Sequence, residues 1–596
     1  MPPNIAIFGR RVENGICGLA LLAMGLLPVL ELGLRALFGS GLPGSVGYVQ
    51  NLTLWVGFLG AIIASREGRH LSLSTGSLVV PGSLQPLAAS LTTIVSTMVG
   101  AGLFWASLGF VQSEMADPVR VGGWLPLWCV ESVLPLSFLI ITWRFIRQAG
   151  STTQQILATL GIPLAAALGW LLAPAAEALL WPALIGLVIA AVLGAPIFVV
   201  LGGAALALFF ADGVPVAAIP VETYRIVVSP SIPTIPLFTL TGFLLAEGGA
   251  SRRLVRLFHA LFGWLPGGLV IATTLVCAFF ATFTGASGVG ILALGGLLLP
   301  ILLKGGLPER FSLGLVTATG SIGLLFPPSL AIILYGVVAH LSIPDLFKAG
   351  LVPGALMVAA VCLFGVYQSL KSGARWHAFD AREAVTAIWQ AKWEILLPVI
   401  VLVGIFGGFS TLVEAAAISI VYTLIVEVVI HRDLHPVRDL PRVLVQCATL
   451  IGGVFIILGV AMGVANYLVD AQIPMKAAVW IRQHVDSQIV FLLALNIFLL
   501  LVGCLMDLFS AIVVVVPLLL PIGEAFGLHP LHLAMIFLVN LELGYLTPPV
   551  GMNLFLAAYR FDKPLTEIYR CALPFLLLLL AVVLAVTYLP WLIIGV

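Results

Sequence analysis

Long apolar stretches recur along the whole chain and are separated by short polar segments. The N-terminal part contains five of them, at 12–38, 46–65, 87–112, 129–147 and 156–176. A helix needs roughly 20 apolar residues to cross a bilayer, so each stretch predicts a membrane-spanning helix. The first stretch follows Arg10 and Arg11 as a signal peptide would, but it is long for one and has no evident cleavage site. We therefore expect it to be retained as the first span.

Basic residues gather on one side of the membrane if the first four spans alternate in direction. Arg10, Arg11, Arg66, Arg69, Arg144 and Arg147 then share a side, whereas Glu114 and Asp117 lie on the other. Cytoplasmic loops carry the excess of Lys and Arg in membrane proteins. This rule predicts a cytoplasmic N-terminus and, with the later spans, a periplasmic C-terminus.

From about residue 180 onward, glycine and proline interrupt the apolar stretches, as in GASGVG at 285–290 and FPPS at 326–329. The later basic clusters can all be cytoplasmic only if 268–302 and 488–522 each enter and leave the membrane on the same side. Both stretches are broken in the middle, and halves of about 15 residues, or roughly 22 Å, are too short to cross. We therefore predict two re-entrant helical hairpins. A pair of short full spans at each place is the alternative.

A repeat relates the two hairpins and the segments that follow them. At a constant offset of 221 residues, LLLPI at 297–301 recurs at 518–522, Gly306-Leu307 as Gly527-Leu528, Gly323 as Gly544, and Pro327-Pro328 as Pro548-Pro549. Leucine matches alone mean little in so apolar a chain, but the shared prolines and glycines in one register are hard to explain by chance. The topology opens the hairpins to opposite sides, so the two units are inverted. Secondary transporters are commonly built from inverted repeats with interrupted helices, and their site lies at the repeat interface.

The composition fits a protein that faces lipid. Hydrophobic residues make up 61% of the 596 residues and charged residues only 9%, whereas soluble domains carry about 25% charged residues. The net charge of +1 argues against a nucleic-acid partner, because phosphate binding needs clustered Lys and Arg. The seven cysteines are scattered without the spacing of metal ligands. No metal site is therefore expected, apart from the sodium sites considered below.

The two Pro-Pro pairs are candidate cation sites. Each pair removes two backbone donors and disfavours helix at the preceding residue, which leaves nearby carbonyl oxygens free. Irregular backbone at membrane depth occurs only where it is buried in protein or lines a cavity. Free carbonyls and hydroxyls suit a hard cation such as sodium. Gly320, Ser321 and Gly323 precede the first pair, and Thr547 and Gly551 flank the second. A kink without a ligand is the alternative for either pair.

The hairpin tips are candidate anion sites. Thr284-Gly285-Ala286-Ser287 lies at the first break, and Gly503 to Ser510 lies at the second. A tip exposes backbone N–H groups of the returning half-helix, whose positive dipole end attracts an anion. The alternative is that these glycines only permit close helix packing.

Asp507 lies in the second tip between apolar residues. An ionisable group in such a place is costly and is a functional candidate by default. Three roles are open: ligand of a cation, cap of the returning half-helix, or proton acceptor. Glu542 and Glu414 are further acids, for which a hydrogen-bonded structural role is the alternative.

These segments resemble the tripartite ATP-independent periplasmic (TRAP) transporters. The family's large membrane subunit is similar to this chain over about 180–596, through PLFTLTG at 236–242, TGAS at 284–287, GLLFPPS at 323–329, DLFKAGLVPG at 345–354 and LTPPVG at 546–551. Residues 1–150, with Trp55, REGRH at 66–70 and Trp143-Arg144, more loosely resemble its small four-helix subunit. The chain is then a fused small-plus-large permease, in which 151–179 forms a connecting transmembrane helix.

The resemblance implies both a fold and a transport cycle. It implies an all-α polytopic membrane protein of the elevator type, driven by sodium and supplied by a periplasmic substrate-binding protein. It places sodium ligands at Ser287, Gly320, Ser321, Gly323, Gly503, Asp507, Thr547 and Gly551, and substrate contacts at Thr284, Gly285, Ala286, Ser287, Pro327, Pro328, Pro548, Pro549 and Asn553. The first tip departs from the family's common Ser-Gly-Ser-Ser-like pattern. Thr284 keeps a hydroxyl and Ala286 has none, which weakens the case for a contact at position 286.

The sequence thus predicts a secondary transporter of the bacterial inner membrane that takes up a small organic acid anion with sodium. Dicarboxylates, sialic or other sugar acids and sulfonates are all open as substrates. No GxxxxGK[ST] motif and no haem or flavin signature is present, so neither an ATPase subunit nor an organic cofactor is expected. A proton-coupled exporter without a binding protein is the alternative, which Asp507 and Glu542 leave open. An intramembrane enzyme would need a nucleophile with a base, or a metal cluster, and neither occurs at helical spacing.

Overall fold

The computed structural model describes residues 3–68, 85–170, 176–285, 288, 290–373 and 378–593. The chain divides into two compact units. The first comprises Met1–Pro236, Leu444–Pro474 and Val513–Leu518, and the second comprises Leu237–Val443, Met475–Ile512 and Leu519–Val596. Nearly all regular structure in the described residues is helical; the strands β1 (Arg120–Val121) and β2 (Leu125–Pro126) form one short antiparallel pair.

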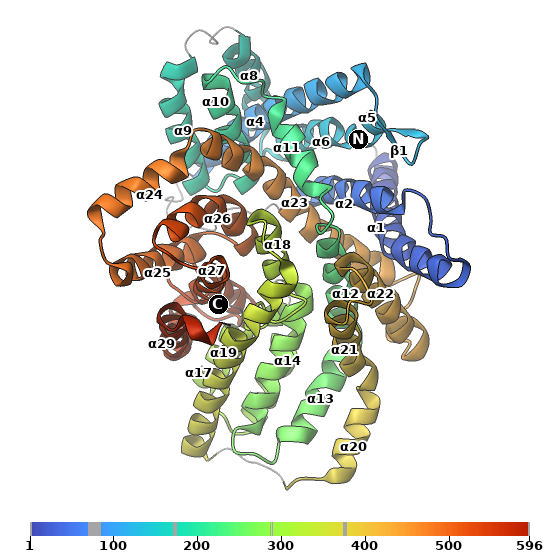
Figure 1. The fold of residues 1–596 in the computed structure, drawn as a ribbon, viewed down its shortest axis with the longest axis vertical. Coiled ribbons are helices and arrows are strands. Elements are labelled where there is room, and N and C mark those ends of the chain that lie inside the picture. Colours follow the sequence, from blue (N-terminus) through green and yellow to red (C-terminus); the bar gives the residue numbers. More distant parts are fainter. Residues whose placement is uncertain are drawn as a thin grey trace. The chain divides into compact units, whose positions relative to one another are not determined.

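The first four predicted spans are confirmed as helices. They are α1 (Pro3–Phe38), α2 (Ser45–Glu67), α4 (Gln85–Ala116) and α5–α6 (Leu127–Glu131 and Val133–Gln148), drawn in blue in Figure 1. An ion-pair cluster joins three of them, because Glu13 of α1 accepts hydrogen bonds from Arg66 of α2 and Arg144 of α6. The Arg69 used in the orientation argument lies outside the described residues.

The connecting segment differs from the single helix predicted over 156–176. A capping box between Ser151 and Gln154 begins α7 (Thr152–Thr159), and the helix is interrupted at Leu160 before α8 (Gly161–Trp170). Gly161 lies so close to the backbone of Ile94 in α4 that a Cβ atom there would approach its carbonyl oxygen to 2.7 Å. Residues 171–175 lie outside the description, so the role of 151–179 as one transmembrane helix stays a prediction.

The rest of the first unit is built from α9 (Ala176–Val192), α10 (Ile197–Ala211), α11 (Ala218–Val227) and most of α23 (Leu440–Asp470). Glycines allow α2 and α23 to cross closely. Gly60 packs against the carbonyl group of Ala448, and Gly57 packs against the ring of Phe455. Small residues of this kind are typical of helix crossings in membranes, where backbones approach without side chains between them.

The second unit contains both repeats. The bounds of its helices are α12 (Thr234–Glu247), α13 (Ala250–Phe262), α14 (Gly268–Thr284), η2 (Gly290–Leu294), α16 (Gly295–Lys304), α17 (Glu309–Thr319), α18 (Leu330–Val338), α19 (Ile343–Ser372), α20 (Ala381–Gln390), α21 (Lys392–Phe406), α22 (Leu412–Leu424), η3 (Ile425–Ile430), α24 (Ile473–His484), α25 (Gln488–Leu505), α26 (Leu508–Ala525), α27 (Pro530–Gly544), α28 (Met552–Phe561), α29 (Leu565–Tyr588) and η4 (Pro590–Leu592). Of these, α12 and α24 begin in the first unit, and α26 includes a stretch that belongs to it, Val513–Leu518.

Both predicted hairpins fold back on themselves. In the first, α14 ends at Gly285, and Gly305 after α16 lies against Leu269 at the start of α14. In the second, the break falls at Met506 and Asp507, and the amide of Gln488 donates to the carbonyl of Phe526 at 3.3 Å. The rings of Phe491 and Phe526 stack at 4.0 Å between centroids. The two ends of each segment therefore meet, as a hairpin requires.

The helices of the second hairpin are longer than predicted. Its helices α25 and α26 have 18 residues each, or about 27 Å at 1.5 Å per residue, which nearly matches the hydrocarbon thickness. The contacts between their ends show that the segment folds back, which a re-entrant hairpin and a pair of full spans have in common.

The repeat predicted from the sequence extends over whole helices. The pairs α14 and α25, α16 and α26, α17 and α27, α18 and α28, and α19 and α29 follow in the same order. Gly306 and Gly527 both adopt a left-handed backbone, with φ of 86° and 74°, after equivalent helices. Gly323 and Gly544 each lie against the first helix of their own hairpin. The two repeats are thus alike in structure as well as in sequence.

By length and apolar composition, ten helices in the described part of the chain could cross a membrane. The pair α20 and α21, bent by 60°, would form one more broken span. The chain is therefore an all-α polytopic membrane protein, as predicted.

Candidate functional site

Both predicted helix interruptions are present, one in each repeat. Residues 320–329 separate α17 from α18, and 545–551 separate α27 from α28. The first segment is buried along nearly all its length, including Pro327 and Pro328, whereas Pro548 and Pro549 are exposed. Prolines leave carbonyls of the preceding turn without helical donors, which is the backbone that sodium sites in transporters use.

Asn553 connects the two interruptions. Its side-chain amide donates to the hydroxyl of Ser321 at 3.1 Å and to the carbonyl of Thr317 at 3.2 Å, both in the first repeat. Its backbone N–H donates to the carbonyl of Tyr545 at 3.2 Å, in the second. Asn553 is fully buried, and its own Oδ1 has no partner in the described residues. A buried acceptor without a donor is the kind of group that a cation or water satisfies.

The first hairpin tip lies close to the first interruption. Thr284 ends α14, and its hydroxyl donates to the carbonyl of Phe280 at 2.9 Å. Gly285 follows with φ of 60° and packs against Leu330, so both the backbone and the space favour glycine. Where the chain returns, a Cβ on Gly290 would lie 3.2 Å from the carbonyl oxygen of Gly320. The predicted site residues Ala286 and Ser287 lie outside the described residues.

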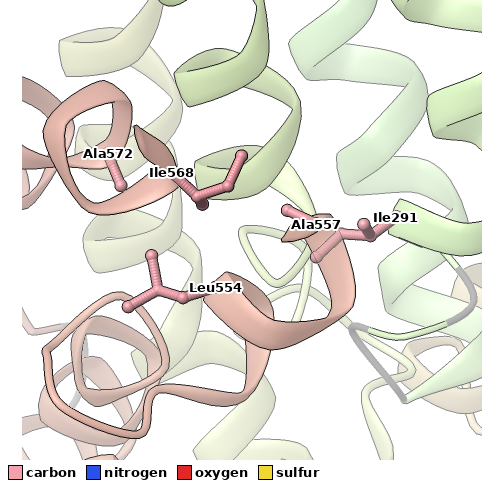
Figure 2. Packing of buried hydrophobic residues seen from close by; sticks show 5 residues of the cluster. All are labelled: Ile291, Leu554, Ala557, Ile568 and Ala572. Carbon is pink, nitrogen blue, oxygen red and sulfur yellow. The ribbon is translucent and has the colours of Figure 1, made fainter. Parts of the chain in front are cut away.

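Apolar packing holds the returning half of the first hairpin against the second repeat. Ile291 of η2 lies beside Ala557 of α28 in a buried cluster that also contains Leu554 of α28 and Ile568 and Ala572 of α29, as Figure 2 shows. All five are at most 1% exposed. Ile291 follows Gly290 in the sequence, and Leu554 follows Asn553. The cluster therefore packs the start of the returning half-helix against the helix that follows the second interruption.

The second tip is capped by Asp507. Its carboxylate accepts from the backbone N–H groups of Phe509 and Ser510, each at 3.1 Å, and from the hydroxyl of Ser510. The capping role predicted as one of three is therefore present. The N–H of Leu508 donates to the phenol oxygen of Tyr545 at 2.7 Å, so the tip is joined to the second interruption. Only 7% of Asp507 is exposed.

The second interruption is a tight turn. The Thr547 hydroxyl donates to the carbonyl of Leu543 at 3.1 Å. Gly551 has φ of 24°, and a Cβ there would lie 2.7 Å from the carbonyl oxygen of Tyr545 and 2.9 Å from that of Thr547. Two carbonyls therefore converge beside Gly551, which is a suitable arrangement for a cation.

Gly503 serves helix packing. It lies in α25 against Gly544 and Leu541 of α27, and a Cβ on Gly544 would come within 2.6 Å of the Gly503 backbone. The role of Gly503 as a sodium ligand stays a prediction.

We expect Gly544→Ala to destabilise the protein by about 1–3 kcal/mol, because the added methyl forces α25 and α27 apart. Thermal unfolding in detergent measures the effect. Gly453→Ala is the matched control, since Gly453 lies in helix α23 with open space around its Cα atom. Equal melting temperatures for the two variants would contradict the close approach.

Sequence reasoning missed two residues of this site, Tyr545 and Thr317, and gave no separate role to Ser510 within the predicted second tip. Tyr545 and Thr317 each take part in a hydrogen bond that connects a tip or an interruption, and the hydroxyl of Ser510 donates to Asp507. Tyr545 could have been suspected, because a tyrosine within an apolar span beside a Pro-Pro pair needs a partner for its hydroxyl.

Glu542, which the sequence had indicated as a further acid, is 2% exposed, and neither of its carboxylate oxygens has a hydrogen-bond partner in the described chain.

The fold and site define a class of protein: a multi-pass helical membrane transporter built on two like repeats with broken helices. The family model of the tripartite ATP-independent periplasmic transporter DctM component matches residues 184–592, and that of the DctQ component matches 24–155. The chain belongs to the TRAP transporter family and joins a small and a large permease subunit in one polypeptide. It is a secondary transporter of the bacterial inner membrane and not an enzyme.

Two relatives illustrate the range of the family. The chain is 32% identical over 545 residues to the isethionate TRAP transporter permease protein DctMQ of Oleidesulfovibrio alaskensis, covering 90% of this chain and 86% of that protein. It is 36% identical over 358 residues to the C4-dicarboxylate TRAP transporter large permease protein DctM of Pseudomonas aeruginosa, covering 60% and 83%. Among solved structures, the YdaH transporter of Alcanivorax borkumensis is similar with a TM-score of 0.46 and 15% identity, over 60% of this chain and 84% of that one.

Proposed function

We propose that this permease takes up a small organic acid anion together with sodium and receives it from a periplasmic substrate-binding protein. The observation that carries the proposal is the position of Asn553, which hydrogen-bonds to the first interruption through Ser321 and to the second through Tyr545. Two broken segments held together at a pair of hairpin tips form the arrangement in which secondary transporters bind substrate and coupling ions.

Sodium is proposed to bind at two related places. In the first repeat, the proposed ligands are Ser287, Gly320, Ser321 and Gly323; of these, Ser321 hydrogen-bonds to Asn553, whose Oδ1 has no partner among the residues that the structure describes. In the second, they come from Asp507, Thr547 and Gly551, where the carbonyls of Tyr545 and Thr547 converge. Hard cations prefer such oxygen ligands, and unwound helices supply them.

The substrate is proposed to be a small anion such as a dicarboxylate, a sugar acid or a sulfonate. The N-terminal end of a returning half-helix attracts an anion such as a carboxylate or sulfonate. At the second tip, the first N–H groups of α26 are already bound by Tyr545 and Asp507, so the anion is proposed to bind at the first tip. The two relatives described above are isethionate and C4-dicarboxylate transporters, and both of these substrates fall within this class. Thr284, Gly285 and the Pro-Pro pairs are the proposed contacts.

Access to the site is proposed to alternate by an elevator movement. The repeats offer two hairpins of equivalent design, and the distribution of basic residues opens one to each side of the membrane. In this orientation the N-terminus is cytoplasmic and the C-terminus is periplasmic. A substrate-binding protein would deliver its ligand on the periplasmic side.

Glu542 favours a second candidate, proton coupling without a binding protein. A buried carboxyl with no hydrogen-bond partner can take up and release a proton. Uptake into proteoliposomes separates the two proposals. Sodium-driven uptake that needs the soluble binding protein supports the first, whereas proton-driven efflux without sodium or that protein would support the second and reject the first.

We expect Thr547→Val to raise the sodium concentration for half-maximal uptake about fivefold, because a lost hydroxyl ligand costs about 1 kcal/mol. Thr449→Val is the control: its hydroxyl makes the same bond to the preceding turn, donating to Val445 at 2.7 Å, but it lies in α23. An unchanged sodium dependence in Thr547→Val would remove this side chain from the site.

A further inference from the structure

A groove with one basic wall and one apolar wall lies at the base of the first hairpin, at the opposite end from its tip. It opens into a cavity of 370 Å³ whose lining includes His259 of α13, Leu269 of α14, and Ile301 and Lys304 of α16. A shallower depression continues it, and His259 and Ile301 line both. The groove therefore runs along α13 and α16 and belongs entirely to the second unit.

The basic wall is one face of helix α13. Arg252, Arg256 and His259 are spaced four and three residues apart, so their side chains lie on the same side of the helix. The opposite wall comes from α16, where Leu297 and Ile301 share a face and Lys304 ends the row. A ligand in the groove would meet cations on one side and hydrocarbon on the other.

Two cations of the groove carry uncompensated charge. Arg252 and Lys304 are exposed, and among the described residues no carboxylate lies within ion-pair distance of either. Arg256 is paired with Glu383 of α20 at 2.7 Å, and its neighbour Arg253 points to a different cluster. The groove therefore has a net positive charge that a negatively charged ligand would balance.

Aromatic residues beside the groove are typical of a membrane surface. Trp264, in the turn between α13 and α14, is 46% exposed and meets the ring of Phe379, itself 54% exposed, in an edge contact. Trp is enriched where a protein crosses from hydrocarbon to head groups, and basic residues are enriched on the cytoplasmic side. The groove thus has the features expected at the level of cytoplasmic lipid head groups.

We propose that this groove binds an anionic glycerophospholipid of the cytoplasmic leaflet. The phosphate head group would lie against the cations that line the groove, Arg252 in its shallow part and Lys304 in its cavity, and an acyl chain would cover Leu297 and Ile301. Basic pockets beside transmembrane helices bind such lipids through the same combination of charge and apolar surface. A free phosphate would gain nothing from the apolar wall. The transported substrate is a different ligand, because its proposed site lies at the hairpin tips.

The test compares lipids in neutral nanodiscs made of phosphatidylcholine that contain the purified full-length protein. Phosphatidylglycerol should raise the melting temperature and bind as discrete adducts in native mass spectrometry, whereas extra phosphatidylcholine or inorganic phosphate should do neither. In Arg252→Gln/Lys304→Gln, phosphatidylglycerol should bind about tenfold more weakly or worse. Arg252→Lys/Lys304→Arg should retain binding, which would show that charge and not folding is responsible.

Arg310→Gln/Arg438→Gln is the matched control, since it removes the same charge from exposed positions that do not line the groove. An equal loss of binding in this control would mean non-specific attraction, and the proposal would fail. It would also fail if inorganic phosphate gave the full thermal shift, which would indicate a free-anion site, or if phosphatidylcholine bound as well as phosphatidylglycerol.

Discussion

Asp507→Asn is expected to leave the fold intact and to raise the sodium concentration for half-maximal uptake about 10- to 150-fold, since a hydrogen-bonded charged group contributes about 1.5–3 kcal/mol. Asparagine caps a helix about as well as aspartate, because its side-chain oxygen accepts from the same backbone N–H groups. The acceptor for Phe509 and Ser510 at the start of α26 is therefore kept. The charge beside the site is removed, together with the acceptor of the Ser510 hydroxyl.

Asp507→Ala is the companion variant. It removes both the charge and the cap, so we expect an additional loss of about 1 kcal/mol of stability, visible as a lower melting temperature. The two variants together separate the roles. If Asp507→Asn transports with unchanged sodium dependence while Asp507→Ala is unstable, the carboxylate serves only as a helix cap, and its proposed role as a cation ligand is wrong.

The sequence predicted the hairpins and the repeat because glycine and proline report backbone conformation locally. Gly306 and Gly527 share a left-handed backbone, and each Pro-Pro pair follows the end of a helix. The preference of glycine for a left-handed backbone and the exclusion of proline from a helix interior do not depend on the rest of the fold. A shared register of such residues is therefore visible without a structure.

The contacts that assemble the site could not be predicted in this way. Asn553 and Ser321 are 232 residues apart, and no local pattern specifies which buried hydroxyl an asparagine meets. The bond from Leu508 to Tyr545 likewise depends on how α25 and α27 cross, which Gly503 and Gly544 determine by close packing. The length of the helices in the second hairpin was also predicted wrongly, since α25 and α26 have 18 residues each. That the segment folds back is shown by the contacts between its two ends.

The cluster around Arg253 is another arrangement that the sequence did not indicate. The guanidinium of Arg253 in α13 pairs with Glu394 of α21, with Glu427 of η3 at 2.9 Å, and with Asp433. The side chains of Glu394 and Glu427 are 0% exposed. Asp433 lies after the end of η3 at Ile430. Burial acts to raise the pKa of Asp433, but the hydrogen bond and the charge of Arg253 outweigh this effect and hold the pKa below its ordinary value. Arg253 thus pairs with three acids from two segments that are far from it in the sequence, one at Glu394 and one at Glu427 and Asp433.

Arg253→Gln is therefore expected to destabilise the protein by about 3–5 kcal/mol, because it leaves two buried carboxylates without a counter-charge. The matched control is Arg256→Gln, three residues away, whose partner Glu383 is exposed; exposed pairs contribute about 0–1 kcal/mol. Thermal unfolding in detergent compares the two. Removing the buried charges as well, in Arg253→Gln/Glu394→Gln/Glu427→Gln, should recover much of the lost stability. If the triple variant were as unstable as Arg253→Gln, the effect would come from lost packing of the arginine side chain and not from unpaired charge.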